Sequence, residues 1–251
     1  MNLKKENISE WLNLIHKWKE KYPICPKEYY QSSEQINPYV FFDFLSNQTG
    51  DGDIIIPEAG CNVTWGMQGY RVGKNQRLFT AFNHSPMGYG IPAAIGACLA
   101  NNKKRVIPII GDGGFMMNEQ ELATIQKHNL PIKIFVMNNE GYGMMKQTQE
   151  IWLDSRYVAS SKESLYFPDL RKIAEAHGIK KTLSIKNLDE LKEKIRETLD
   201  YEGPVLCDVA IHPNSRIYPK LTFGRPIEDS APLLNRSEFY ENMIVRPLDK
   251  K

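Results

Sequence analysis

The sequence lacks the features that mark several classes of protein. Its four cysteines are widely spaced and form no Cys-x-x-Cys pair, which argues against a zinc site or a disulfide framework. The longest apolar runs, such as residues 106–110, are far too short to span a bilayer, and the first residues contain no signal-peptide core. We therefore expect a protein of the reducing cytoplasm that does not enter a membrane.

An excess of charge of one sign is also missing. With 32 basic and 30 acidic side chains, the formal net charge is +2, which is too small to attract nucleic acid or an anionic membrane. There is no internal repeat and no low-complexity segment. The 251 residues, 41% of them apolar and 25% charged, instead have the composition of a globular protein with a sizeable core.

The periodicity of apolar residues alternates between that of strands and that of helices. The predicted strands are residues 54–56, 78–81, 106–110, 132–137, 179–183 and 205–211, and the predicted helices are residues 62–67, 89–99, 119–128, 144–151, 168–176 and 188–199. This order predicts a doubly wound α/β fold, with about six parallel strands and helices on both faces of the sheet. Ligands of such sheets bind beyond the carboxyl ends of the strands.

Three segments are predicted along the chain. Residues 1–35 form an amphipathic helix and a linker, residues 36–212 form the α/β domain, and residues 213–251 form an irregular arm rich in proline and charge. The apolar stripe of the first helix has to cover either this domain, which is the more ordinary arrangement, or a neighbour outside the chain. Asn37-Pro38 has the form of an N-cap and first residue of a helix.

Two polar turns follow two of the predicted strands. Residues 106–110 lead into Gly111-Asp112-Gly113-Gly114, and residues 132–137 lead into Asn138-Asn139. If these strands are neighbours, the oxygens of Asp112 and Asn139 converge on one point, and both are ligands suited to magnesium. The glycines let backbone N–H groups approach a phosphate at the start of the following helix.

Each turn taken alone has an ordinary structural explanation, because Gly-Asp-Gly is a common tight turn and Asn-Asn often ends a strand. Together they match a signature. Gly-Asp-Gly, twenty-four residues and Asn-Asn is the pattern that thiamine-diphosphate enzymes share. The segment Met87-Gly88-Tyr89-Gly90-Ile91-Pro92-Ala93-Ala94-Ile95-Gly96-Ala97 resembles the acetolactate synthase group, as do Asn118 to Thr124 and Gly143-Met144. The resemblance covers about residues 36–212.

The resemblance implies thiamine diphosphate and Mg²⁺ as cofactors, and a role for several residues. It assigns magnesium to Asp112, Asn139 and the carbonyl of Gly141. The residues that it brings close to the cofactor are Gly60, Cys61, Asn62, Gly111, Asp112, Gly113, Gly114, Asn139, Gly141, Gly143 and Met144. Met87 would lie beneath the bent cofactor, and the carbonyl of Ser85 would accept a hydrogen bond from its 4′-amino group. The ordinary role of both methionines is core filling.

Other residues near this motif have two interpretations. His84 could face the substrate as an acid, a base or a hydrogen-bond donor, or it could be a loop histidine bonded to backbone. Glu58 could support the turn after the first strand, or it could contact the cofactor. Substrate specificity is expected to differ from the synthases, because Cys61-Asn62 replaces a glutamine-histidine pair and Thr148 replaces a tryptophan.

The resemblance implies a lyase or transferase that decarboxylates or joins 2-oxo acids. It also implies an oligomer, because in this family a second, pyrimidine-binding domain supplies a glutamate to the cofactor, and every motif found here belongs to the first domain. We therefore expect the chain to be inactive alone. Two alternatives remain: a non-catalytic binding or assembly module, and a nicotinamide-dependent oxidoreductase suggested by the G-x-G-x-x-A pattern of Gly88, Gly90 and Ala93.

Overall fold

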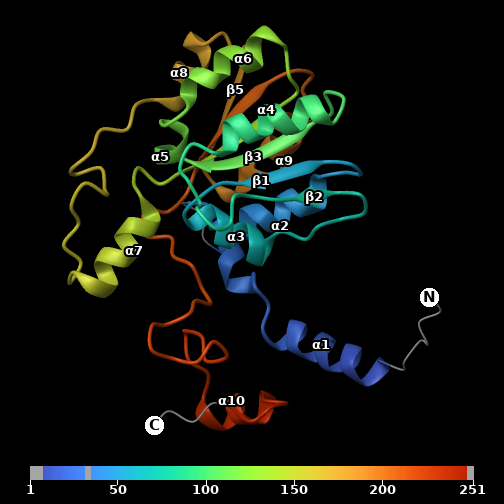
Figure 1. Ribbon diagram of the computed structural model, residues 1–251, viewed down its shortest axis with the longest axis vertical. Helices are drawn as coiled ribbons and strands as arrows, with labels where there is room; N and C mark the ends of the chain where they lie inside the picture. Colours follow the sequence, from blue (N-terminus) through green and yellow to red (C-terminus); the bar gives the residue numbers. More distant parts are fainter. Residues whose placement is uncertain (1–7, 32–34, 248–251) are drawn as a thin grey trace. The chain divides into compact units, whose positions relative to one another are not determined.

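A single parallel sheet forms the centre of the domain in the computed structural model, which describes residues 8–31 and 35–247. Its strands are β1 (Ile54–Pro57), β2 (Arg77–Leu78), β3 (Val106–Gly111), β4 (Lys133–Asn138), β5 (Lys181–Ile185) and β6 (Val205–Ala210). They lie in the order β2-β1-β3-β4-β6-β5 and every neighbouring pair is parallel (Figure 1). The predicted six-stranded parallel sheet is confirmed.

Helices cover both faces of this sheet (Figure 1). One face carries α4 (Gly90–Ala100), α6 (Leu122–Lys127) and α8 (Leu170–Ala176), and the other carries α2 (Pro38–Gln48), α3 (Cys61–Gly69) and α9 (Leu188–Asp200). The chain therefore winds in both directions from the centre of the sheet, as the alternating pattern predicts.

The central strands β1 and β3 are buried on both faces, which explains why they contain no charged residue. Ile54 and Ile56 pack in the core beside α4, whereas Ile55 points to the opposite face. On that second face the rings of Phe41 in α2 and Phe135 in β4 meet edge to face, with their centroids 5.3 Å apart.

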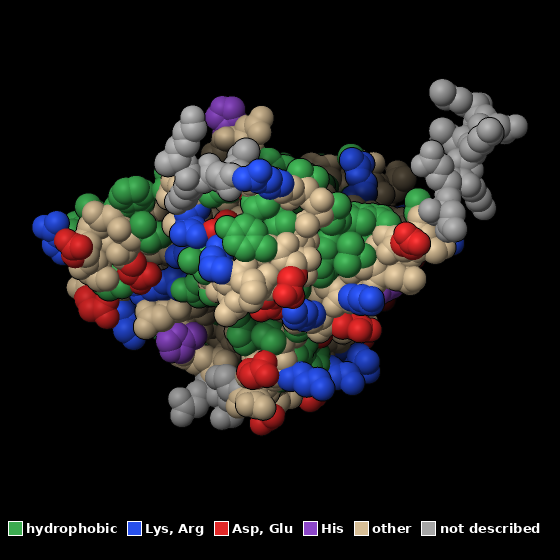
Figure 2. All heavy atoms as spheres, turned by 90° about the horizontal axis from the view of Figure 1, so that it is seen from below, with side chains coloured by type: hydrophobic (Ala, Val, Ile, Leu, Met, Phe, Trp, Pro, Cys, Tyr) green, Lys and Arg blue, Asp and Glu red, His purple; other side chains and the backbone are tan. Residues whose placement is uncertain are grey.

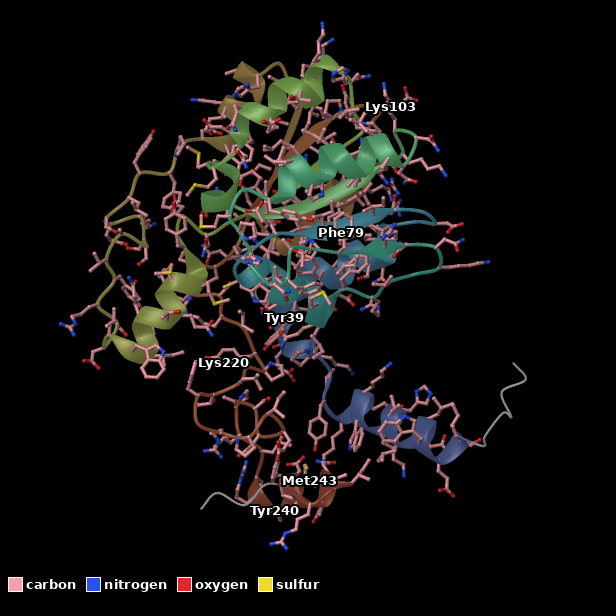
Figure 3. All side chains as sticks on the ribbon, in the orientation of Figure 1. Tyr39, Phe79, Lys103, Lys220, Tyr240 and Met243 are labelled. Atoms are coloured by element: carbon pink, nitrogen blue, oxygen red, sulfur yellow. The ribbon has the colours of Figure 1, made fainter. Side chains whose placement is uncertain are left out.

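Local polar contacts fix where the helices begin. The Oδ1 atom of Asn37 accepts the N–H of Tyr39 at 2.9 Å, with Pro38 in the first turn of α2, which confirms the predicted cap. Asn187 caps α9 by accepting the N–H of Glu190 at 3.1 Å. Within the same layer, the hydroxyl of Tyr39 donates to Gln68 of α3 at 2.6 Å (Figure 3).

Three elements differ from the sequence prediction. The predicted helix 119–128 is split into a 3-10 turn, η2 (Glu119–Glu121), and α6. An additional helical turn, α5 (Asp112–Phe115), begins directly after β3, because the side chain of Asp112 binds backbone amides that would otherwise have no partner. The strand predicted at residues 78–81 ends at Leu78, since only Phe79 continues to bond β1, through Ile55 at 3.2 Å.

The first helix, α1 (Ser9–Lys21), has no buried residue. Its tryptophans, Trp11 and Trp18, pack against each other edge to face with centroids 6.0 Å apart. Ile15 and Trp18 of the apolar stripe are partly buried, and packing of that stripe on this domain stays a prediction. The linker that follows contains a short 3-10 helix, η1 (Lys27–Gln31).

The chain divides into two compact units, Met1–Ser215 and Arg216–Lys251. In the second unit, Lys220 and Ala231 exchange two backbone hydrogen bonds of 2.8 Å, and Asp229 forms ion pairs with Arg225 and Arg236. A helix, α10 (Arg236–Asn242), begins at an Asn235 cap. Apart from this helix, the described residues 213–247 contain no named helix or strand, and the division of the chain at residue 213 stays a prediction.

Acidic and basic side chains are interspersed on the face drawn in Figure 2, in keeping with the formal charge of +2. Among residues 8–31 and 35–247, no helix is both long enough and apolar enough to cross a bilayer.

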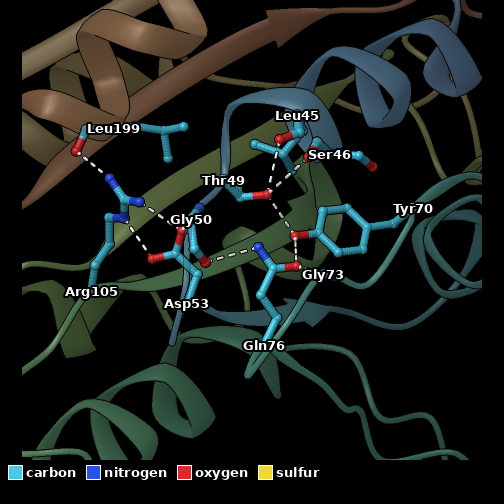
Figure 4. A network of polar contacts seen from close by, with 10 residues as sticks. All are labelled: Leu45, Ser46, Thr49, Gly50, Asp53, Tyr70, Gly73, Gln76, Arg105 and Leu199. Carbon is cyan, nitrogen blue, oxygen red and sulfur yellow. Dashed lines mark hydrogen bonds and ion pairs between the residues drawn. The ribbon is translucent and has the colours of Figure 1, made fainter.

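A polar network closes the amino-terminal edge of the sheet (Figure 4). Two nitrogens of Arg105 donate to the two oxygens of Asp53, at 2.7 and 2.6 Å, and a third donates to the carbonyl of Leu199 at 3.0 Å. Gln76 donates to the carbonyl of Gly50 at 2.9 Å and accepts from the hydroxyl of Tyr70 at 2.9 Å. These contacts join β1, β3 and the end of α9.

We predict that Asp53→Asn lowers the free energy of unfolding by about 2–3 kcal/mol, because it leaves the Arg105 guanidinium without a bidentate carboxylate. Lys162→Gln is the matched control, because it breaks an ion pair on the surface. The side chain of Lys162 is 58% exposed and that of its partner Glu140 is 51% exposed, so this change should lower the free energy of unfolding by less than about 1 kcal/mol. Urea unfolding monitored by circular dichroism measures both values. Equal losses would contradict the assignment of the Asp53 network as an anchor of the fold.

Candidate functional site

Three turns meet at the carboxyl edge of the sheet and enclose a cavity of about 220 Å³. They follow β1, β3 and β4, which lie side by side in the sheet. Most of the residues singled out in the sequence line this cavity: Gly60, Cys61, Asn62, Ser85, Met87, Gly111, Asp112, Gly113, Gly114, Asn139, Gly141, Gly143 and Met144. A doubly wound sheet binds ligands at this edge.

The side chain of Asp112 joins two of the turns. It is 2% exposed, and its Oδ1 atom accepts the N–H of Gly113 at 2.7 Å. Its Oδ2 atom accepts the N–H groups of Asn139 and Gly141, at 3.2 and 3.1 Å, across the neighbouring strand. Burial raises the pKa of Asp112 to about 7, and the amide hydrogen bonds oppose that rise. A cation placed at this carboxylate would offset the cost of burying it.

The donor set around Asp112 suits a metal that is shared with an anionic ligand. Asn139 is 7% exposed and lines the same cavity, as does Gly141. Among the described residues there is no group of three or more His, Cys, Asp or Glu side chains that could hold a metal ion. One carboxylate with neutral oxygens leaves positions that the oxygens of a phosphate could fill.

The turn Gly111-Asp112-Gly113-Gly114, which we call the glycine cradle, has little or no room for larger residues at its glycines. A Cβ atom on Gly113 would overlap the ring of Tyr142, and one on Gly114 would overlap the Oε1 atom of Glu58. At Gly111 a Cβ would lie 3.3 Å from Nδ2 of Asn62. Glycine at these positions therefore lets Asn62, Tyr142 and Glu58 pack closely against the turn.

The amino-terminal end of α3 forms the opposite side of the cradle. Gly60 precedes the helix with φ +78°, a conformation that favours glycine, and no side chain caps the helix. A helix start preceded by glycine is a common geometry for anion binding. Asn62 is 4% exposed, and its Oδ1 atom has no hydrogen-bond partner among the described residues. An orphaned buried carboxamide beside a glycine-lined cavity fits a polar ligand held there.

Methionine side chains border part of the cavity. Met87 and Met144 are 42% and 36% exposed, so neither is a buried core residue. Met144 and Gly143 open α7 (Gly143–Trp152). Ser85 also lines the cavity, with φ +40°. His84 is exposed and is absent from the lining, so the structure does not bring it to this site.

The side chain of Glu58 supports a turn, but it is the turn at residues 88–90 and not the one that follows β1. Glu58 is 1% exposed, and its oxygens accept the N–H groups of Gly88 at 3.0 Å and Gly90 at 2.6 Å. Burial raises the pKa of Glu58, and these two hydrogen bonds lower it. Because the amides of Gly88 and Gly90 are occupied, the G-x-G-x-x-A pattern does not present them to a dinucleotide pyrophosphate.

Several other residues that line the cavity were not predicted from the sequence, namely Ala59, Trp65, Met137, Tyr142, Met145 and Ile211. For two of them, the position in the sequence pointed to the site. Trp65 lies four residues after Cys61, one helical turn further along α3, and Tyr142 lies between two predicted site glycines.

A segment after α7 supports the turn at Gly141. Ser160 accepts the N–H of Tyr142 at 2.9 Å through its carbonyl, and its hydroxyl donates to Gln149 of α7 at 2.6 Å. Gly141 and Ser161 form an isolated antiparallel bridge. The backbone beside Asp112 is therefore held from outside the cavity as well as from within.

Comparison with known proteins shows which family the chain belongs to. Acetolactate synthase large subunit from Porphyra purpurea is 34% identical over 221 residues, which cover 88% of this chain and 36% of that protein. Mitochondrial acetolactate synthase from Schizosaccharomyces pombe is 34% identical over 231 residues, 90% of this chain and 34% of that protein. Chloroplastic acetolactate synthase 2 from Nicotiana tabacum is 34% identical over 234 residues, with the same coverage. The chain spans about a third of the length of these curated relatives.

A family description matches the part of the chain that builds the cavity. Residues 58–209 match "Thiamine pyrophosphate enzyme, C-terminal TPP binding domain", where thiamine pyrophosphate is another name for thiamine diphosphate. The match begins at Glu58, includes all three turns and ends in β6. The chain therefore belongs to the thiamine pyrophosphate enzymes, as an acetolactate-synthase-like C-terminal TPP-binding domain.

Proposed function

We propose that residues 36–212 bind thiamine diphosphate together with Mg²⁺ and form half of the active site of a lyase or transferase acting on a 2-oxo acid. The observation that carries the proposal is the buried carboxylate of Asp112 in a glycine-lined cavity at the ends of β1, β3 and β4. Bound thiamine diphosphate would supply the electron sink for decarboxylation or carboligation.

Asp112, Asn139 and the carbonyl of Gly141 would hold Mg²⁺. The magnesium assignment is supported by the oxygen chemistry of these residues and by the cost of burying Asp112 without a cation. With a single carboxylate, the site would bind metal weakly until diphosphate oxygens complete the coordination. Metal and cofactor should therefore depend on each other.

The diphosphate would lie between the glycines that follow β3 and the start of α3. The turn Gly111-Asp112-Gly113-Gly114 lines one side of this space, and Gly60, Cys61 and Asn62 at the start of α3 line the other. The orphaned carboxamide of Asn62 supports a polar contact there.

The aromatic rings of the cofactor would pack on Met87 and Met144, with Ser85 nearby as an acceptor. The partial exposure of both methionines supports this role, because a partly exposed apolar side chain at a cavity mouth is available to a ligand. Cys61-Asn62 and Thr148 are positions where the acceptor or substrate preference would diverge from that of the synthases.

A second domain would complete the site. Met145, which lines the cavity, is 53% exposed, and Phe82 and Met117, on segments next to lining residues in the sequence, are 56% and 50% exposed. The relatives named acetolactate synthase are about three times as long as the matched region. Both observations support a pyrimidine-binding partner domain, and hence an oligomeric or larger enzyme in which this chain alone is inactive.

Asp112→Ala should lower the affinity for thiamine diphosphate by more than about 100-fold and abolish its dependence on Mg²⁺, since it removes the only charged ligand of the metal. Isothermal titration of the purified chain with the cofactor, with and without Mg²⁺, measures this. Unchanged affinity with unchanged magnesium dependence would show that the metal assignment is wrong.

Gly114→Ala should weaken cofactor binding by at least about tenfold, because the added methyl group displaces Glu58 and narrows the cradle at a cost of roughly 1–3 kcal/mol. Gly96→Ala in α4 is the matched control, since a Cβ there meets no atom within 4 Å. The control should bind the cofactor normally and melt at the same or a higher temperature. Loss of binding in both variants would point to a general effect on the fold.

The wild-type chain, supplied with pyruvate, thiamine diphosphate and Mg²⁺, should release carbon dioxide no faster than the cofactor does without protein. The reason is that the activating glutamate expected for this family has no counterpart among the described cavity residues apart from Glu58, whose oxygens are both bonded to backbone amides. The same preparation must bind the cofactor in the titration above. Steady decarboxylation by the chain alone would refute the need for a partner domain.

A further inference from the structure

Glu58 lies at the meeting point of the two halves of the cavity. It follows β1 and precedes the start of α3, so its backbone belongs to the diphosphate side. Its carboxylate reaches across to the turn that carries Met87, where it accepts the N–H groups of Gly88 and Gly90. The Oε1 atom also fills the space beside Gly114 that a Cβ would need.

The glycines around this carboxylate are shaped for it. A Cβ on Gly90 would lie 2.7 Å from the Oε2 atom of Glu58, and it would also overlap Ile110. Gly88 has φ +81°, and a Cβ there would lie 2.8 Å from Cβ of Met117. A larger residue at position 90 would therefore meet Glu58 itself, whereas one at position 88 would meet Met117 and Asn118.

A second contact holds the same turn from the opposite side. Asn118, which follows α5, donates from Nδ2 to the carbonyl of Gly88 at 2.7 Å. The peptide groups on either side of Gly88 are thus fixed by Glu58 at the N–H and by Asn118 at the C=O. Met87 is the adjacent residue, so its place in the cavity depends on these two side chains.

We propose that Glu58 is a positioning residue that holds the Met87 turn at a fixed distance from the glycine cradle, so that one ligand can reach both. The inference rests on the proposed function, because it takes the cradle as the diphosphate side and Met87 as the ring side. Direct contact of Glu58 with the cofactor is disfavoured, because both oxygens already accept short hydrogen bonds from backbone amides.

Glu58→Gln tests the proposal with almost no change in volume. The carboxamide can accept one of the two backbone N–H groups, but its NH₂ then faces the other, and two donors cannot bond. The turn should move while the cradle stays intact. Titration of the full chain, in the presence of Mg²⁺, compares thiamine diphosphate with inorganic pyrophosphate, which has no rings.

We expect Glu58→Gln to lower the affinity for thiamine diphosphate by roughly tenfold or more, because it leaves a buried hydrogen-bond donor without a partner. The affinity for pyrophosphate should fall by less than about twofold. A merely structural role would lower both affinities equally, and that result would overturn the inference. Unchanged affinity for both ligands would also overturn it. If the wild-type chain binds neither ligand, the proposed function itself fails.

Two further variants test whether Glu58 acts through the Met87 turn. Asn118→Ala releases the same turn from the other side, so it should show the same preference for pyrophosphate, and it decides the question if Glu58→Gln does not fold. In a Met87→Ala background, Glu58→Gln should cost clearly less affinity for thiamine diphosphate than it does in the wild type, because the contact that it positions is already gone. Full additivity of the two losses would contradict action through Met87.

Discussion

The carboxylate of Asp112 must stay buried where the turns after β3 and β4 meet, and much of the surrounding architecture follows from that requirement. A carboxylate withdrawn from water needs hydrogen bonds, and here three backbone amides supply them, from its own turn and from the neighbouring one. Glycine is required at positions 113 and 114 of this turn, because a Cβ there would overlap the ring of Tyr142 or the Oε1 atom of Glu58. The parallel sheet sets the geometry, because neighbouring strands deliver both turns to one edge.

Glu58 repeats this arrangement one strand away. It is also nearly completely buried, and it is also bound by backbone N–H groups rather than by a basic side chain. The two carboxylates join different turns. Asp112 joins the turn after β3 to the turn after β4, and Glu58 joins the end of β1 to the Met87 turn. In the described structure no lysine or arginine neutralises either of them, so both depend on backbone amides. A ligand that carries its own metal would add a cation near Asp112.

The two edges of the sheet are stabilised differently. At the amino-terminal edge, Arg105 and Asp53 form a bidentate pair that also reaches the end of α9, and the buried amine of Lys133 donates to the carbonyls of Tyr201 and Gly203. Burial lowers the pKa of Lys133 to about 8. Long side chains fill this edge and tie several elements together, whereas small residues leave the carboxyl edge open. The fold thus concentrates its side-chain cross-links on the side away from the cavity.

The sequence by itself determined the parallel sheet and the cap at Asn37, because apolar periodicity and capping are local properties. It predicted that the Asp112 and Asn139 turns converge only if their strands are neighbours, and the order of the sheet decided that they are. Its resemblance to a family also named the residues that line the cavity. The tertiary structure decided what depends on contacts between distant parts of the chain. Glu58 meets Gly88 thirty residues away, Tyr142 closes over Gly113, and His84 lies outside the cavity, although it is only three residues from Met87. No local pattern encodes these pairings, because each is fixed by how separate turns pack once the strands are in register.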